Sequence, residues 1–358
     1  MDTEPDGRPG GDQWPLVAGY LNAASMGVPS RAVVAAMRAD LDRWSTGTAT
    51  APGYDEDVRR ARAAFARLVG ADVGRVAVGS QVSALVGLVA ASLPDGARVV
   101  CPEGEFTSVV YPFLVHADRG VRVETVPVAG LADAVRPGVD LVAFSLVQSA
   151  DGALADADAI RSAAREAGAI VLADLTQAAG WLPVDAGDFD VTVTGAYKWL
   201  CAPRGSAFMT VSPELTSRLR PLYAGWYAGE SPWDSVYGSD MRLAADARRL
   251  DLSPAWPVWA GTAPAIELFA DLAGPGAPHV DAVRGHGAGL ADSVRRGLDL
   301  EPTGSPILSL PDADGRVQAA LEAAGCRVAA RAGGVRIAFH LWNDGADARR
   351  VLDAVRAR

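Results

Sequence analysis

The sequence has little of what marks secreted, membrane-bound or nucleic-acid-binding proteins. Its three cysteines, Cys101, Cys201 and Cys326, are odd in number and far apart, which favours a reducing compartment over a disulfide framework. No stretch reaches the ~18 consecutive apolar residues of a membrane span, and the first residues lack the basic and apolar regions of a signal peptide. The net charge is −10 and no long basic run occurs, so neither nucleic acid nor an anionic membrane is an expected partner. These absences predict a soluble, cytoplasmic protein.

Motifs for metals and nucleotides are also missing. The four histidines lack metal-ligand spacing and no cysteine pair supports zinc, so no metal site is predicted. The run GHGAG at 285–289 follows helix-like sequence and not a strand, which argues against a dinucleotide fingerprint, and no phosphate-binding G-x-x-x-x-G-K-[ST] loop is present. A cofactor, if one binds, is therefore of another kind.

What the chain does have is a long series of short apolar segments. With 358 residues, 49% of them hydrophobic, it can bury a large core and form more than one domain. Helical stretches such as 81–93, 107–117 and 157–167 separate most of these segments. The pattern predicts an α/β fold with a largely parallel sheet covered on both faces, and its seven candidate strands are 75–79, 98–101, 121–126, 140–145, 169–173, 190–194 and 206–210.

The composition changes along the chain in a way that suggests three parts. Residues 1–16 are acidic and rich in Gly and Pro and are predicted as a flexible tail, 17–245 as the large domain, and 246–358 as a smaller α+β domain. Between 221 and 262 the pattern gives way to loops dense in Trp, Tyr, Gly and Pro. Aromatic residues in such loops line a site or a subunit interface, or they pack an irregular connection, and the sequence leaves these alternatives open.

Two residues at strand ends carry the chemical signal. Lys198 follows a predicted buried strand and stands between Tyr197 and Trp199, where desolvation disfavours the ammonium and leaves a nucleophilic amine. Asp174 follows the preceding strand, at the edge where open α/β sheets bind ligands. The alternative readings are a surface lysine and a helix-capping aspartate.

A pyridoxal phosphate site requires such a lysine, together with an acid that keeps the pyridine nitrogen protonated. Its phosphate needs donors at the start of a helix, which the segment Ser80-Gln81-Val82 after the first strand supplies. Phe106 is placed to cover the ring, unless it belongs to the core. Arg336, in GGVRIAFHLWN, is placed to bind a substrate carboxylate, unless it pairs with a structural acid.

The sequence contains three spaced motifs, D-x-x-Q at 174, YKW-x-x-x-PRG around Lys198 and RI-x-FH-x-WN from Arg336. In combination, these motifs resemble the class V aminotransferase family. The resemblance runs from YLNAASMG at 20 to HLWN at 343. It implies fold-type I, a homodimer with sites at the interface, a small amino acid as substrate, and pyridoxal 5'-phosphate in Schiff-base linkage to Lys198. It also implies that Asp174 pairs with the pyridinium. The remaining residues that it implies are Gln177 for the phenolic oxygen, Ser149 beside it, Ser80, Gln81, Thr194 and Tyr197 for the phosphate, Trp226 and Ser253 from the partner subunit, and Asn22 with Arg336 for the substrate.

One departure from the cysteine desulfurases of this family bears on the reaction. Those enzymes carry a nucleophilic cysteine on a loop before the carboxylate arginine, whereas the run from Arg331 to Arg336 leaves no room for one, and Cys326 precedes it. A C–S lyase that eliminates a sulfur leaving group from a cysteine S-conjugate or thioether is therefore the first expectation. An aminotransferase or epimerase is the alternative, ahead of a desulfurase or a non-catalytic relative.

Overall fold

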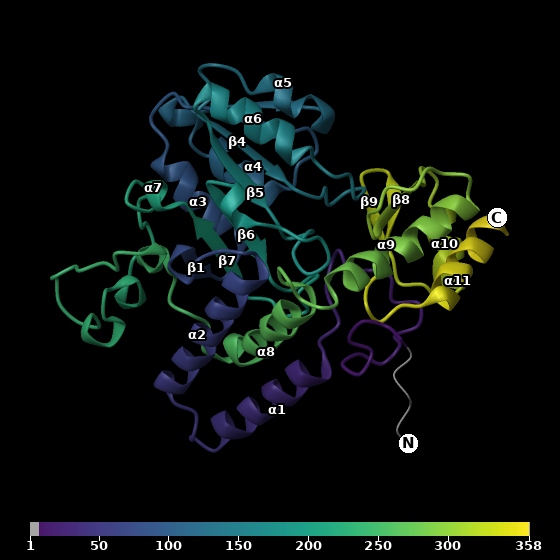
Figure 1. The fold of residues 1–358 in the computed structure, drawn as a ribbon, viewed down its shortest axis with the longest axis horizontal. Helices are drawn as coiled ribbons and strands as arrows, with labels where there is room; N and C mark the ends of the chain where they lie inside the picture. Colours follow the sequence, from purple (N-terminus) through teal and green to yellow (C-terminus); the bar gives the residue numbers. More distant parts are fainter. Residues whose placement is uncertain (1–6, 358) are drawn as a thin grey trace.

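A seven-stranded sheet between two layers of helices forms the larger part of the computed structural model, which describes residues 7–357 (Figure 1). The strand order is β1-β7-β6-β5-β4-β2-β3. All seven predicted strands are confirmed to within one residue at each end, and their bounds are β1 (Val76–Gly79), β2 (Arg98–Pro102), β3 (Arg122–Val126), β4 (Leu141–Ser145), β5 (Ile170–Asp174), β6 (Val191–Gly195) and β7 (Ala207–Val211).

The direction of the strands brings the chemically interesting ends together. Strands β2 to β6 are parallel to one another, while β7 runs antiparallel to both β6 and β1. The register pairs Ser145 with Asp174, and it pairs Ala207, at the start of β7, with both Gly79 and Gly195. The ends of β1, β4, β5 and β6 and the beginning of β7 therefore lie at one edge of the sheet.

Alternating side chains of the strands serve two different cores. In β1, Val76 and Val78 belong to the cluster that includes α2 and α8, while Ala77 belongs to the cluster on the opposite face. The first face is covered by α2 (Ala51–Leu68), α5 (Leu131–Ala134), α6 (Ala157–Ala167) and α8 (Trp256–Ala273). The second is covered by α3 (Val82–Ser92), α4 (Thr107–Leu114) and α7 (Pro213–Thr216). Both faces of the sheet are buried except at the edge strand β3, which explains the continuous apolar runs of the other strands.

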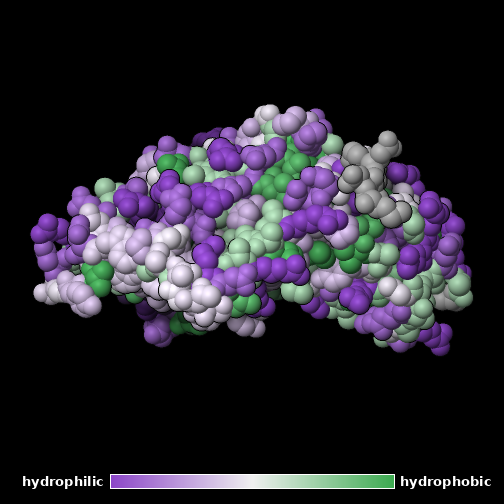
Figure 2. Space-filling view, turned by 90° about the horizontal axis from the view of Figure 1, so that it is seen from below, coloured by the Kyte–Doolittle hydropathy of each residue, from purple (hydrophilic) through white to green (hydrophobic). Residues whose placement is uncertain are grey.

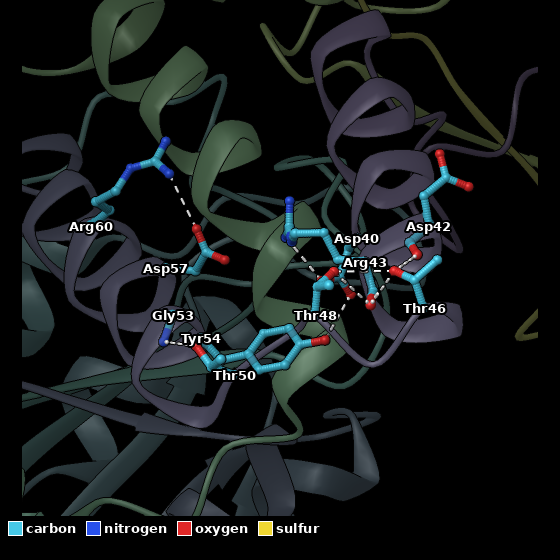
Figure 3. A network of polar contacts seen from close by, with 10 residues as sticks. All are labelled: Asp40, Asp42, Arg43, Thr46, Thr48, Thr50, Gly53, Tyr54, Asp57 and Arg60. Atoms are coloured by element: carbon cyan, nitrogen blue, oxygen red, sulfur yellow. Dashed lines mark hydrogen bonds and ion pairs between the residues drawn. The ribbon is translucent and has the colours of Figure 1, made fainter.

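A network of polar contacts fixes the connection between α1 (Arg31–Ser45) and α2 beside α8 (Figure 3). The Tyr54 hydroxyl donates to Asp40 Oδ2 at 3.2 Å, and Arg43 Nη2 donates to Asp40 Oδ1 at 2.9 Å. The hydroxyl oxygen of Thr50 caps α2 by accepting from the Gly53 N–H at 3.3 Å. These contacts hold the two helices together as one hairpin, which packs against α8.

The C-terminal part has its own small sheet, ordered β8-β10-β9, and its own core. The turn between β9 and β10 consists of two residues, Ala332 and Gly333, both with positive φ. The N-terminal segment joins this sheet, because Ala338 N donates to Leu21 O at 2.8 Å. The elements are β8 (Ile307–Pro311), β9 (Ala329–Arg331), β10 (Gly334–Ala338), α9 (Val280–Gly297), α10 (Arg316–Ala323) and α11 (Gly345–Arg356).

The start of α8 differs from the sequence expectation. It begins at Trp256, inside the stretch 221–262 that was expected to consist of loops. Pro and Gly obscured the helical pattern of α8, but its Pro257 lies in the first turn, where a proline is tolerated, and Gly261 packs closely against Pro203 and Met37. The division of the chain at 246 stays a prediction; α8, which follows it, packs against α1 and α2.

The segment predicted as a flexible tail is packed where the structure describes it. Residues 1–6 lie outside the described range, but Trp14 is fully buried. Its indole nitrogen donates to Val28 O at 2.9 Å and its ring lies 5.8 Å from that of Phe269. The expectation of a flexible tail rested on the Gly, Pro and acidic residues of this segment. The structure differs because the side chain of Trp14 packs in the core.

The surface seen from below in Figure 1 carries hydrophobic patches among hydrophilic residues (Figure 2). On α1, Leu41 and Trp44 are 59% and 63% exposed. Within residues 7–357, none of the helices combines the length and the hydropathy that crossing a membrane requires.

Candidate active site

A cavity of about 270 Å³ opens at the sheet edge where the strand ends meet. Its volume is close to the lower end of the roughly 300–1,000 Å³ typical of small-molecule sites. Nine residues predicted from the sequence line it: Ser80, Gln81, Val82, Phe106, Ser149, Asp174, Gln177, Tyr197 and Lys198.

Lys198 comes from the turn that follows β6 and is only 5% exposed. Burial lowers the pKa of its amine to about 8, although the charge of Asp174 acts in the opposite direction. The amine lies 5.0 Å from the centre of the Phe106 ring, which also borders the cavity. An amine with such a pKa is still mainly protonated at pH 7, but its uncharged fraction is far larger than that of an ordinary lysine, and this fraction can act as a nucleophile or a base.

Asp174 ends β5 and is 4% exposed. Burial raises the pKa of its carboxyl to about 6, while the hydrogen bonds from Thr176 and the charge of Lys198 lower it. Its Oδ1 accepts from the Thr176 N–H at 2.8 Å. A buried acid without an ion pair at contact distance among residues 7–357 gains from a cationic ligand group, such as a protonated ring nitrogen.

The start of α3 faces the cavity through Ser80, Gln81 and Val82. The Gln81 side chain does not cap the helix, so the first amide groups of α3 are available for an anion. The chain turns here through Gly79, where a Cβ would lie 2.8 Å from Leu85 Cδ2. A larger residue at 79 would have to displace the side chain of Leu85.

Gln177 lines the cavity with its amide fully engaged. Its Oε1 accepts from Trp199 Nε1 at 2.7 Å, and because an indole only donates, this contact fixes the orientation of the amide. Its Nε2 donates to Ala24 O at 3.0 Å and to Ser149 Oγ at 3.1 Å. The predicted bond to a phenolic oxygen therefore requires one of these two contacts to be exchanged.

Arg336 lies behind Ser149, 1% exposed, and does not line the cavity itself. Its Nη1 donates to Ser149 O at 2.5 Å and to Ser149 Oγ at 3.1 Å, and its Nη2 donates to Ser25 Oγ at 2.7 Å. Its Nε has no partner within the described residues, and burial lowers the pKa of its guanidinium to about 10. A buried arginine that no carboxylate of residues 7–357 contacts is suited to bind an anion from outside the chain.

Four predicted residues also lie outside the cavity of their own chain. Thr194 is buried within β6, where the alternation of the strand places it on the face of Thr192 and not at the edge. Asn22 forms a bridge to Ala338 beside β10. Trp226 packs against Trp233 at 5.0 Å between ring centres, and Ser253 is exposed in the segment before α8.

Several residues at the site escaped the sequence prediction. Glu105 is 7% exposed and accepts from Ser145 N at 2.7 Å and from Phe106 N at 2.6 Å, so it fixes the turn that carries Phe106. The signal available in the sequence was the position of Glu105, directly before the predicted site residue Phe106. Ser25 gave no signal, because its partner Arg336 is 311 residues away. The cavity lining that was not predicted comprises Ser83, Ser108, Ser145, Thr176, Gly195, Arg204, Gly205 and Ser206.

The arrangement fits pyridoxal phosphate on chemical grounds. It provides an amine of lowered pKa at Lys198, a buried acid at Asp174, an aromatic face at Phe106 and the free amide groups of α3. Asp174 and Lys198 lie at the ends of adjacent strands, β5 and β6, and α3 follows β1 at the same edge. Each functional group of the cofactor thus has a matching group along this edge.

Sequence comparison places the chain in a known family. Residues 22–272 match the family model described as Aminotransferase class-V. The uncharacterized aminotransferase YcbU of Bacillus subtilis (strain 168) is 28% identical over 85% of this chain and 84% of its own length. Isopenicillin N epimerase of Streptomyces clavuligerus is 30% identical over 68% of this chain and 65% of its own length. A kynureninase of Burkholderia pseudomallei is 28% identical over 65% of this chain and 61% of its own.

Structural comparison agrees in fold. A cystine C–S lyase, C-DES, in complex with cysteine persulfide has a TM-score of 0.83 at 17% identity, covering 95% of this chain and 97% of its own. The cysteine desulfurase CsdA from Escherichia coli has a TM-score of 0.80 at 19% identity, covering 95% and 94%. Together with the family match over residues 22–272, these likenesses show that the chain belongs to the class-V aminotransferase family of pyridoxal-phosphate-dependent enzymes, with the fold of the fold-type I transferases.

Proposed function

We propose that the enzyme is a C–S lyase that eliminates a thiol from a cysteine S-conjugate or a related thioether. Removal of the Cα proton and loss of the Cβ–S bond leave aminoacrylate, which water converts to pyruvate and ammonia. The observation that carries this proposal is a cavity with one amine, Lys198, and no thiol among its lining residues. β-Elimination needs a single base and a leaving group that departs as a thiolate, and it requires no nucleophilic cysteine.

Lys198 is the base in this proposal. The bound cofactor supplies an electron sink that stabilises negative charge at Cα. The buried amine of Lys198, with its pKa lowered to about 8, takes the proton from Cα and holds it while the thiolate departs. Asp174 supports this step by keeping the ring nitrogen protonated.

Arg336 and its serine partners select the substrate by its carboxylate. The guanidinium is held in place by its hydrogen bonds to Ser149 and Ser25, and its Nε, which has no partner among residues 7–357, is available for a charge-assisted hydrogen bond to a carboxylate. Ser149 Oγ also accepts from Gln177 Nε2, so the group that Arg336 contacts is linked to the amide that is proposed to bind the cofactor's phenolic oxygen. Substrate and cofactor oxygens would thus share one hydrogen-bonded chain.

A persulfide-forming desulfurase is disfavoured by the positions of the cysteines. Cys101, Cys201 and Cys326 are all at most 2% exposed, and burial raises the pKa of each thiol. The two-residue turn between β9 and β10 also has no room for a loop with a further nucleophile. A buried thiol with a raised pKa is a poor nucleophile.

The test is to incubate the holoenzyme with cysteine S-conjugates and to measure pyruvate and free thiol. Equimolar release of the two supports the lyase. Stoichiometric persulfide on a cysteine of the protein would instead support the desulfurase, and release of neither product would exclude the lyase for these substrates.

Transamination or epimerisation is the second candidate, because the aminotransferase YcbU and isopenicillin N epimerase are among the relatives. Transamination also needs only one base, which moves a proton from Cα to the cofactor. Conversion of the cofactor to its pyridoxamine form without thiol release would favour transamination. Loss of optical activity with deuterium incorporation at Cα would favour epimerisation.

We also propose that the enzyme is a homodimer in which Trp226 and Ser253 complete the partner's phosphate pocket. Neither residue lines the cavity of its own chain, and the exposed Leu41 and Trp44 offer apolar surface for association. Mixing Lys198→Ala subunits with Trp226→Ala subunits tests this: each mixed dimer would contain one intact site and regain activity. If Trp226 served its own chain, mixing would restore nothing.

A further inference from the structure

Arg204 is a cation at the cavity that the proposed function does not use. It lies in the turn between Lys198 and β7, lines the cavity, and is exposed at its mouth. Its guanidinium carbon lies 5.1 Å from the centre of the Tyr197 ring. No carboxylate, carbonyl or hydroxyl of residues 7–357 accepts a hydrogen bond from it. The charge of Arg204 is therefore available to a ligand.

The turn that carries Arg204 is held firmly in place. Ala202 N donates to Ala196 O at 3.1 Å and Ala196 N donates to Ser206 O at 3.2 Å, which closes the loop onto itself. Thr262 of α8 donates from its hydroxyl to Ser206 Oγ at 2.9 Å. Gly205, with φ +119°, lies against Val258 of the same helix. These contacts orient the backbone of Arg204 relative to the sheet edge.

Charge balance in the cavity calls for such a residue. A phosphate monoester carries a charge of about −1.5 to −2 at pH 7, yet Ser80, Gln81 and Tyr197, the lining residues predicted to hold the phosphate, are all neutral. The cations that line the cavity are Lys198, which is committed to the cofactor's carbonyl carbon, and Arg204. A guanidinium can bind two phosphate oxygens at once.

The strand register places Arg204 at the phosphate end of the site and away from Arg336. Ala207, three residues after Arg204, pairs with Gly79, so the turn lies beside the segment that leads into α3. Arg336 binds Ser149, which follows β4, and β4 is the third strand from β7. At about 4.8 Å per strand, the strands β7 and β4 from whose ends these contacts are made lie roughly 14 Å apart. One ligand can therefore present its phosphate to Arg204 and a substrate carboxylate to Arg336.

We infer that Arg204 is a cofactor-binding residue whose guanidinium neutralises the phosphate of pyridoxal phosphate at the start of α3. This inference rests on the cofactor and not on the reaction proposed above, so a binding measurement tests it independently of C–S lyase activity. The Arg204 guanidinium also lies over the Tyr197 ring, so both side chains are placed to contact the same phosphate group.

The experiment compares apoprotein binding of pyridoxal phosphate and of pyridoxal, which lacks the phosphate, by absorbance of the lysine-bound form. In Arg204→Ala, affinity for pyridoxal phosphate should fall about 10- to 100-fold, because a charge-assisted hydrogen bond contributes about 1.5–3 kcal/mol. Affinity for pyridoxal should stay within about twofold, because no ion pair is lost. Arg204→Lys should retain part of the preference for pyridoxal phosphate over pyridoxal. Arg218→Ala, which changes an exposed arginine outside the cavity, should retain all of this preference.

Two outcomes would overturn the inference. Equal losses for both ligands in Arg204→Ala and in Arg204→Lys, with unchanged melting temperatures of the apoproteins, would mean that the residue supports the Schiff base and not the phosphate. An unchanged preference for pyridoxal phosphate, combined with weaker binding of an amino acid to the holoenzyme, would assign Arg204 to the substrate.

Discussion

Lys198 and Arg336 are both buried cations, yet burial affects their function in opposite ways. The pKa of Lys198 is lowered to about 8, which brings its proton within reach of the working pH. The pKa of Arg336 is lowered to about 10, so the guanidinium keeps its charge. In the proposed mechanism, the same desolvation therefore suits Lys198 to carry a proton and leaves Arg336 with a fixed charge for binding an anion. Lys198 lies in the turn after β6 of the large sheet, and Arg336 lies in β10 of the small one.

The largest effect should come from removing the proton carrier. Lys198→Ala should reduce turnover by about 10³-fold or more, because general base catalysis is lost together with the covalent link to the cofactor. Added methylamine should restore part of the rate, since a free amine can replace the base. Exchange of the Cα proton in deuterated water provides the measurement, and undiminished exchange in Lys198→Ala would refute the role.

Removing the fixed charge should affect substrate binding and leave the cofactor in place. Arg336→Met should raise KM about 10- to 100-fold, since charge-assisted hydrogen bonds to a carboxylate contribute about 1.5–3 kcal/mol. Arg336→Lys should recover only part of this, because an ammonium cannot bind two oxygens in one plane. Steady-state kinetics measures the effect, with binding of pyridoxal phosphate as the control. A change in cofactor affinity with unaltered KM would contradict the assignment.

Asp174 should make the apoprotein less stable at pH values above the pKa of its own carboxyl group. Asp174 has a folded-state pKa of about 6 against an ordinary 3.8, so its favourable contribution is complete below pH 3.8 and is lost as pH rises through 6. Asp174→Asn, which stays neutral, should therefore stabilise the apoprotein by about 3 kcal/mol above pH 6. Calorimetric unfolding from pH 4 to 8 should show the advantage growing with pH. A constant difference would contradict this account.

The smallest effect should come from the serine that positions Arg336. Ser25→Ala removes the acceptor of one guanidinium hydrogen bond and should raise KM about fivefold, because such a bond contributes about 1 kcal/mol. Ser25→Thr retains the hydroxyl and serves as the matched control. Equal KM values for the Ala and Thr variants and the parent enzyme would show that Ser25 has no influence on the carboxylate.

Contacts that are local in sequence were predictable, and contacts between distant segments were not. Most of the strands could be located because they are apolar runs buried on both faces, and Asp174 and Lys198 could be found because they stand at or shortly after the ends of such runs. The role of Ser25 depends on a bridge between the N-terminal segment and β10, which no local pattern encodes. Arg204 was visible in the PRG turn, but only the pairing of Ala207 with Gly79 brings that turn beside α3.

The start of α8 was missed for a related reason. Its first turns contain Trp256, Pro257 and Gly261, which favour loops when considered alone. In the folded protein these turns pack against α1 and α2, and tertiary contacts outweigh the weak local propensity. The packing of Trp14, which the tail composition concealed, follows the same rule.

The most direct test of the contrast between the two cations is the pH dependence of Schiff-base formation at Lys198. The rate at which the apoprotein takes up pyridoxal phosphate should rise with pH and level off with a midpoint near 8. In Asp174→Asn the midpoint should move to lower pH, because the charge of Asp174 raises the pKa of Lys198, while the ionisations of the free cofactor are the same in both experiments. A midpoint near the ordinary lysine value of 10.5, with no shift in the variant, would contradict the claim that burial converts Lys198 into the proton carrier of this enzyme.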